Sequence, residues 1–88
     1  MSLVKKPIKL ENVEWKKAGN LYLLQDKEKN KTHSIDPISF MVWIQCDGKT
    51  EVEQIVDVFS VNGNRDIIKA AITGVLEKLE GQKLIRWV

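Results

Sequence analysis

The sequence predicts an α+β fold, a small winged-helix-like domain in which a three-stranded antiparallel sheet is followed by three helices. Apolar residues alternate with polar ones in the first part of the chain and recur with helical spacing from residue 36 onward. The chain has 88 residues, of which 43% are hydrophobic and 30% charged, which is typical of one globular domain. We therefore expect a single domain over residues 1–88, with residues 1–6 disordered.

Three strands are expected in the first part of the chain, arranged as a meander. Apolar and charged residues alternate over 13–17, the turn residues Ala18-Gly19-Asn20 follow, and residues 21–24 form an apolar, aromatic run. A polar connection over 26–31 then leads into a short third strand, Lys31–Ile35. If neighbouring strands pair in sequence order, this third strand lies at an edge of the sheet.

The first helix is expected to begin at Asp36-Pro37, which has the residue types of an N-cap and a first helical position. Residues 40–44 are apolar on nearly every side of such a helix, so we expect it to be central in the fold. Asp47-Gly48 is expected to end it, because both residue types favour turns.

Two further helices are expected. Thr50 and Glu53 have the spacing of a capping box, and Asn64 or Asp66 is expected to cap the last helix. The apolar face of the second helix consists of Val52, Ile55, Val56 and Phe59. That of the third consists of Ile68, Ala71, Ile72, Val75, Leu76 and Leu79. Residues 84–88 are expected to form a short apolar strand or tail.

The residues that catalysis would need are nearly absent. The single cysteine, Cys46, excludes an intramolecular disulfide and is expected to be a buried small hydrophobe. The single histidine, His33, cannot form an imidazole-rich metal site, and no glycine-rich phosphate loop occurs. We therefore expect no enzyme activity, no cofactor and no metal.

The location of the protein is predicted from segments that the sequence lacks. The longest apolar run, residues 40–44, is much shorter than the ~18–20 residues of a membrane span. No apolar segment of a signal peptide follows the first lysines. These observations predict a cytoplasmic protein without a membrane partner.

The charge of the chain is uneven. Residues 1–33 contain eight lysines and four carboxylates, a net charge of +4, and residues 34–88 contain six cations and eight carboxylates, a net charge of −2. The positive half either attracts an acidic partner or forms an ordinary solvated surface.

DNA binding is one function that a winged helix can have. The third helix carries cations that could reach phosphates: Arg65, Lys69 and Lys78. It also carries the carboxylates Asp66, Glu77 and Glu80. These charges nearly cancel, whereas a helix that follows a phosphate backbone normally keeps a positive face. Nucleic acid is thus a disfavoured partner, and a DNA-binding winged helix is the alternative to peptide binding.

Peptide binding by strand addition agrees better with the sequence. The expected edge strand, with Thr32, His33, Ser34 and Ile35, is short and could pair with an incoming peptide. The third helix could pack beside it to form a groove. Its apolar residues Ile68, Ile72 and Leu76 would then either line this groove or pack in the core.

Several segments resemble the PqqD-like family, the relatives of pyrroloquinoline quinone biosynthesis protein D. These segments are Lys31–Asp36, Val42-Trp43, Cys46-Asp47-Gly48, Val52 with Ile55, Leu79 and Leu84-Ile85. The spacing W-x-x-C-D-G is the most specific part of the resemblance. The chain departs from the family pattern at three positions. The family often has leucine where this chain has Gln45, usually has threonine where it has Glu51, and has glycine where it has Lys83.

The resemblance implies a non-catalytic adaptor without a cofactor. Such an adaptor binds the leader segment of a ribosomally made precursor peptide and presents it to a modifying enzyme, commonly a radical S-adenosylmethionine enzyme. The pathway need not be quinone synthesis, and an interaction domain of a larger enzyme complex is a further alternative. Cys46, Asp47 and Gly48 are implied to be structural. The peptide-binding residues implied by position are Thr32, His33, Ser34 and Ile35 on the strand and Arg65, Ile68, Lys69 and Ile72 on the helix.

Overall fold

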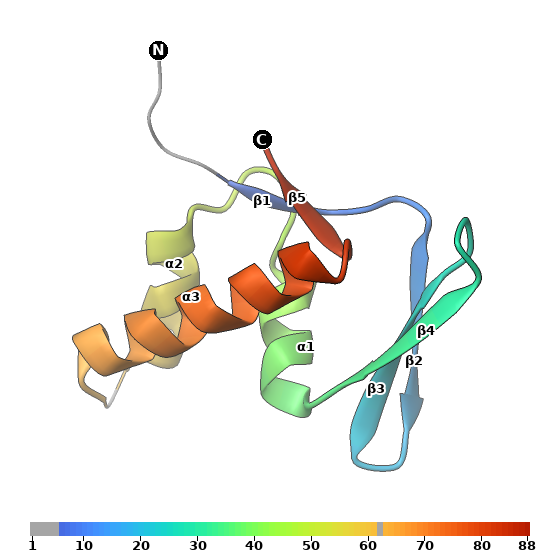
Figure 1. Ribbon diagram of the computed structural model, residues 1–88. Helices are drawn as coiled ribbons and strands as arrows, with labels where there is room; N and C mark the ends of the chain where they lie inside the picture. Colours follow the sequence, from blue (N-terminus) through green and yellow to red (C-terminus); the bar gives the residue numbers. More distant parts are fainter. Residues whose placement is uncertain (1–5, 62) are drawn as a thin grey trace.

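The computed structural model describes residues 6–61 and 63–88 (Figure 1). The strands are β1 (Pro7–Lys9), β2 (Val13–Ala18), β3 (Leu21–Asp26), β4 (Lys31–Ile35) and β5 (Ile85–Trp87). The helices are α1 (Pro37–Ile44), α2 (Val52–Phe59) and α3 (Arg65–Gly81). The predicted fold class is confirmed, because a three-stranded antiparallel sheet precedes three helices.

The three-stranded sheet has the order β2-β3-β4, with each strand antiparallel to its neighbour. A two-residue turn, Gly19-Asn20, joins the first two strands, and Gly19 has φ +62° at the first turn position, as a type II′ hairpin requires. Tyr22 on β3 stacks on Phe40 of α1 with ring centroids 3.9 Å apart, which fixes the sheet against the helices. Figure 1 shows this sheet at one side of the molecule and β4 running directly into α1.

A second, two-stranded sheet joins the two ends of the described chain. β1 pairs antiparallel with β5, with Ile8 opposite Arg86, and Figure 1 shows the two strands crossing near the C-terminus. Lys6 and Val88 extend this pairing through two backbone hydrogen bonds. Of the two alternatives expected for the C-terminal segment, a strand or a tail, the structure has the strand, whereas β1 was not predicted. The expected disorder of residues 1–5 lies outside the described residues, but Lys6 is part of the fold.

The W-x-x-C-D-G segment links α1 to this terminal sheet. The indole Nε1 of Trp43 donates to the carbonyl oxygen of Leu84 at 3.3 Å, and the amide of Lys9 donates to the carbonyl of Cys46 at 3.0 Å. Gly48 has φ +76° and donates to the carbonyl of Pro7. A Cβ at Gly48 would lie 3.0 Å from the side chain of Ile8, so glycine satisfies both the backbone angle and the close approach. The segment is structural.

The N-terminal caps of the helices agree only in part with those predicted from the sequence. Asp36 is the N-cap residue of α1, but its side chain makes no capping hydrogen bond. The capping box of α2 consists of Glu51 and Gln54. The predicted pair, Thr50 and Glu53, was wrong, because each residue of the box lies one position later. Thr50 instead donates its hydroxyl to a carboxylate oxygen of the preceding Asx turn. Of the two predicted candidates for the cap of α3, Asn64 and Asp66, it is Asn64 that accepts from two backbone amides.

The core lies between the three helices and the inner face of the sheet. Its best-buried side chains include Leu24, Val42, Ile55, Leu76 and Leu84. α1, expected to be central, supplies Phe40, Val42 and Trp43 to this core, but its apolar residues are not all buried. Ile38, Met41 and Ile44 are 52%, 48% and 43% exposed, because α3 and the sheet cover only part of the helix surface.

Cys46 is fully buried, and its thiol contacts the carbonyl oxygen of Val42 at 3.3 Å. Burial raises the pKa of the Cys46 thiol to about 12, against a smaller lowering effect of Lys9. In the described ranges 6–61 and 63–88, no group of His, Cys, Asp and Glu side chains could hold a metal ion. In the same ranges no helix has the length and apolarity to cross a membrane.

Candidate functional site

β4 is an edge strand with one unpaired side. It pairs with β3, whereas the C-terminal strand pairs with β1, so within the described residues the chain's own tail leaves this edge open. The backbone groups on the open side follow from the hydrogen-bond alternation of antiparallel strands.

One hydrogen bond fixes this alternation across the whole sheet. The amide of Lys27 donates to the carbonyl of Asn12, which extends the β2–β3 register by one pair. Residues 21, 23 and 25 therefore direct their backbone groups toward β2, and residues 22, 24 and 26 direct theirs toward β4. The partners of these last three residues, Lys31, His33 and Ile35, face β3. Thr32 and Ser34 consequently direct their N–H and C=O groups out of the sheet, toward the open edge.

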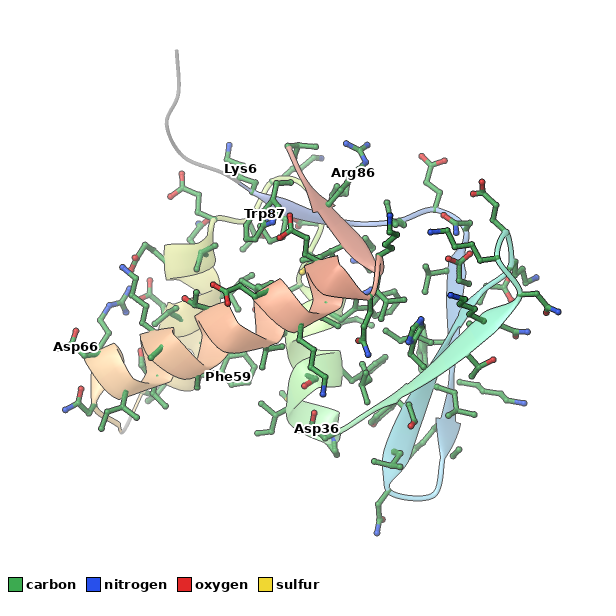
Figure 2. The ribbon with its side chains drawn as sticks, viewed as in Figure 1. Lys6, Asp36, Phe59, Asp66, Arg86 and Trp87 are labelled. Carbon is green, nitrogen blue, oxygen red and sulfur yellow. The ribbon has the colours of Figure 1, made fainter. Side chains whose placement is uncertain are left out.

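Beside the second half of β4 lies a hollow of about 310 Å³ between the strand and α3. Its residues come from the end of β4, the start of α1 and the C-terminal half of α3. They are Ser34, Ile35, Asp36, Ser39, Val75, Lys78, Leu79 and Gln82. In Figure 2 the labelled Asp36 marks the junction of β4 and α1 at which this hollow lies. Ile35 and Leu79 are buried, so the floor of the hollow is apolar.

A second hollow, of about 240 Å³, lies beside the first half of β4. It is formed by the β3–β4 hairpin and the C-terminal end of α3. Its residues are Asp26, Lys29, Lys31, His33, Gly81, Gln82 and Lys83. Gln82 belongs to both hollows, and its buried Oε1 has no hydrogen-bond partner within the described part of the chain. The two hollows together follow β4 over its whole length.

A hollow of about 410 Å³, larger than either of these two, lies elsewhere. It is lined by Glu14, Trp15, Lys16, Leu23, Gln25 and Thr32. Most of these side chains are on the face of the sheet opposite the buried Leu24, and most are exposed. We favour the β4–α3 hollows as the candidate site, because together they combine outward backbone groups of β4 with an apolar floor and a group of lysines.

Asp26 on β3 is the only buried carboxylate among the described residues, and it holds the hairpin next to the site. Burial raises its pKa, but hydrogen bonds from the Lys29 amide, the Asn12 side chain and the Glu28 amide together outweigh that effect, so the pKa lies below its usual value. Asp26 is therefore an ionised, structural carboxylate.

The four strand residues predicted for the site lie together on the open edge, with Thr32 and Ser34 exposed, His33 half-buried and Ile35 buried. The four predicted helix residues lie farther toward the N-terminal end of α3. Asp66, labelled in Figure 2, shows that this end of the helix is at the far side of the molecule from the sheet.

These four helix residues contact α2 and the core. Arg65 forms ion pairs with Glu53 and Asp57, and Lys69 pairs with the same Glu53 at 2.5 Å. Ile68 packs against the core, and Ile72 is 2% exposed. The structure thus brings the strand residues together with a different part of α3, and the binding role of the helix residues stays a prediction.

The residues of α3 and of its C-cap that lie beside β4 are Val75, Lys78, Leu79 and Gln82. Sequence analysis assigned two of them to an apolar stripe and did not connect any with the strand. Helical periodicity identifies which face is buried, but it does not show which turn of a 17-residue helix crosses the sheet edge. No local sequence signal marks that crossing point.

Comparison with known proteins agrees with this geometry. A family model described as "Coenzyme PQQ synthesis protein D (PqqD)" matches residues 22–85, from β3 to the start of β5. A solved structure described as "TbiB1 in Complex with the TbiA(beta) Leader Peptide" has a TM-score of 0.75 and 15% sequence identity, and covers 90% of this chain and 94% of that chain. At this identity the likeness shows a shared fold. A search of curated proteins finds no significant match.

Proposed function

The chain belongs to the PqqD family, and from this premise we propose that it is an adaptor for the leader segment of a ribosomally made precursor peptide. The leader would add to β4 as a further antiparallel strand, with Thr32 and Ser34 supplying backbone hydrogen bonds. The solved structure with the same fold, TbiB1, is in complex with a leader peptide, which supports this class of partner. PqqD-family domains bind without catalysing a reaction, so the chain is not an enzyme.

The observation that carries the proposal is the outward direction of the Thr32 and Ser34 backbone groups next to two hollows. Two residues with two groups each give four hydrogen bonds, worth about 0.5–1.5 kcal/mol apiece. Ordering five peptide residues costs about 1–2 kcal/mol per residue, which cancels this gain. Affinity must therefore come from side chains that enter the hollows, and the apolar floor at Ile35 and Leu79 is suited to an aliphatic one.

The helix residues of the predicted site have a more limited part in this proposal. The guest would contact Val75, Lys78 and Leu79 directly, because these line the hollow beside Ser34. A guest that extends beyond β4 along α3 would be needed to reach Lys69 or Arg65.

The enzyme partner is proposed from family resemblance. Adaptors of this kind present a leader to a modifying enzyme, and we propose a radical S-adenosylmethionine enzyme. Co-purification of this chain with such an enzyme encoded beside it, dependent on or strengthened by the precursor, would test the assignment. Co-purification of the precursor with this chain, in the absence of any such enzyme, would limit the function to leader binding.

The leader proposal is tested by titrating the protein into a fluorescently labelled leader, taken from the precursor peptide encoded beside this chain's gene. We expect saturable binding that an unlabelled leader competes away. A duplex DNA of similar net charge is the control. DNA binding that falls steeply with salt, combined with no response to the leader, would instead identify a DNA-binding winged helix and refute the proposal.

A further inference from the structure

The hollow at the start of β4 collects positive charge. Three lysines line it, Lys29, Lys31 and Lys83, together with one carboxylate, Asp26, so that three positive charges and one negative charge give a net of +2. Lys29 and Lys31 come from the β3–β4 hairpin and from the start of β4, and Lys83, far away in the sequence, follows the C-cap of α3.

Asp26 does not form an ion pair with these lysines. Its Oδ1 accepts hydrogen bonds from the side chain of Asn12 and from the amides of Glu28 and Lys29. Among the described residues, no carboxylate lies within ion-pair distance of Lys29, Lys31 or Lys83, whereas Lys27 in the same hairpin is paired with a glutamate. The positive charge of the hollow is thus available to a guest.

The backbone conformation of Lys83, which lines this hollow, is a second indication that the hollow is functional. Lys83 has φ +60°, a left-handed conformation at the position after the α3 C-cap, where glycine is strongly favoured. Its amide donates to the carbonyl of Glu80 and the amide of Leu84 donates to that of Leu79, which together form a Schellman motif. A lysine here is less favourable for the fold than glycine, and strained positions of this kind concentrate at functional sites.

The geometry of strand addition places guest side chains in both hollows. Side chains of the added strand that point toward α3 lie level with Lys31, His33 and Ile35 of β4. The interval from Lys31 to Ile35 is four residues, about 13 Å at 3.3 Å per residue, and it separates the basic hollow from the apolar one.

We infer that the basic hollow binds a carboxylate side chain of the leader, so that this adaptor selects leaders with an Asp or Glu two or four residues from an aliphatic residue. The inference rests on the proposed function, since it needs the guest strand on β4. In an antiparallel guest the aliphatic residue precedes the acidic one, because the strand then runs from Ile35 toward Lys31.

A phage-displayed library of random twelve-residue peptides, selected on the immobilised full chain, tests this specificity without knowledge of the natural leader. We expect enrichment of peptides that contain Asp or Glu with an aliphatic residue two or four positions before it. One enriched peptide is then synthesised, with a second version in which its acidic residue is replaced by the corresponding amide.

Variants of the chain assign the contact. Lys31→Gln and Lys83→Gln should each weaken binding of the acidic peptide about 2- to 5-fold, as for a partly exposed ion pair, and leave binding of its amide version unchanged. Lys83→Gly should weaken the acidic peptide equally while raising the melting temperature, because it relieves the left-handed strain. Lys49→Gln is the matched control, since exposed Lys49 lies outside both hollows, and it should have no effect.

The outcomes separate this inference from the proposed function. Enriched peptides whose binding is abolished by Ser34→Pro, but which show no acidic preference and no response to the lysine variants, would overturn the inference and leave strand addition intact. Enriched peptides that are unaffected by Ser34→Pro would overturn both. An equal loss in Lys31→Gln, Lys83→Gln and Lys49→Gln would show general charge attraction, which also overturns a specific carboxylate contact.

Discussion

Two proline substitutions at neighbouring positions of β4 should have opposite effects. Ser34 directs its N–H out of the sheet, and His33 directs its N–H toward Leu24 of β3. Proline has no N–H, and edge strands tolerate it where the missing donor faces outward. Ser34→Pro should therefore retain the fold and lose peptide binding, whereas His33→Pro should damage the fold itself.

The magnitudes follow from what each amide contacts. Ser34→Pro removes one donor to the guest and leaves a guest carbonyl unpaired, a penalty of about 1–3 kcal/mol, so we expect a loss of leader affinity of about 5- to 150-fold. Its melting temperature should fall by less than about 5 °C. His33→Pro removes a ladder bond to the fully buried Leu24, and a similar penalty together with backbone strain should lower the melting temperature by about 10–20 °C.

The assay combines thermal melts followed by circular dichroism with fluorescence anisotropy of the labelled leader, at a temperature where both variants are folded. Thr32→Pro serves as a second outward-facing position and should behave like Ser34→Pro. The reasoning would be refuted if Ser34→Pro and Thr32→Pro bound the leader like the parent chain. It would also be refuted if the two neighbouring prolines destabilised the fold equally, since the hydrogen-bond alternation would then be misassigned.

Other regions give four further predictions. Trp43→Phe should lower the free energy of unfolding by about 2 kcal/mol in urea titrations, because the hydrogen bond to the carbonyl of residue 84 is lost and the ring volume shrinks. Cys46, with a pKa near 12 in the folded chain, should resist thiol reagents at pH 8 until denaturant is added, and rapid reaction in the native state would contradict its burial. The pKa of Asp26 is lower in the folded than in the unfolded chain, so its stabilising effect is complete above about pH 4 and is lost as pH falls through the folded value. Asp26→Asn should therefore make the free energy of unfolding depend less steeply on pH at acid pH. Arg65→Ala should destabilise the α2–α3 pair slightly, an effect that shrinks as salt is raised, and a leader confined to β4 should bind the variant normally.

Local signals in the sequence were sufficient for most of the fold. The alternation before residue 36 and the helical spacing after it gave the order of the strands and helices from β2 to α3, and Asn64 was one of two candidates for a cap because its residue type has a local mechanism. β1 was missed because three residues beginning with proline have no strand pattern of their own. It forms because β5 and the carbonyl of Cys46 supply its partners, and both are far away in the sequence.

The candidate site could likewise be predicted from local sequence signals only in part. The strand residues were found because a short polar strand at the end of a meander is recognisable from its neighbours. The helix residues opposite them depend on where α3 crosses the edge, which is set by the packing of three elements. The ion pairs of Arg65 and Lys69 with Glu53 illustrate the difficulty, since a cation on an exposed helix face has the same sequence signature whether it binds a guest or a neighbouring helix.

The pairing of β5 with β1 explains how a chain of this size keeps an open strand edge. A C-terminal strand could have extended the three-stranded sheet at β4, which would have covered the strand edge beside α3. Instead, Trp43 of α1 donates a hydrogen bond to the carbonyl of Leu84, and after the turn at Lys83 the chain pairs Ile85 with Lys9. Because bound leader adds hydrogen bonds to β4 without replacing any of the chain's own, its free energy of binding adds to the stability of the fold. A leader at a concentration that saturates the parent chain should therefore raise its melting temperature, and should raise that of Ser34→Pro by less.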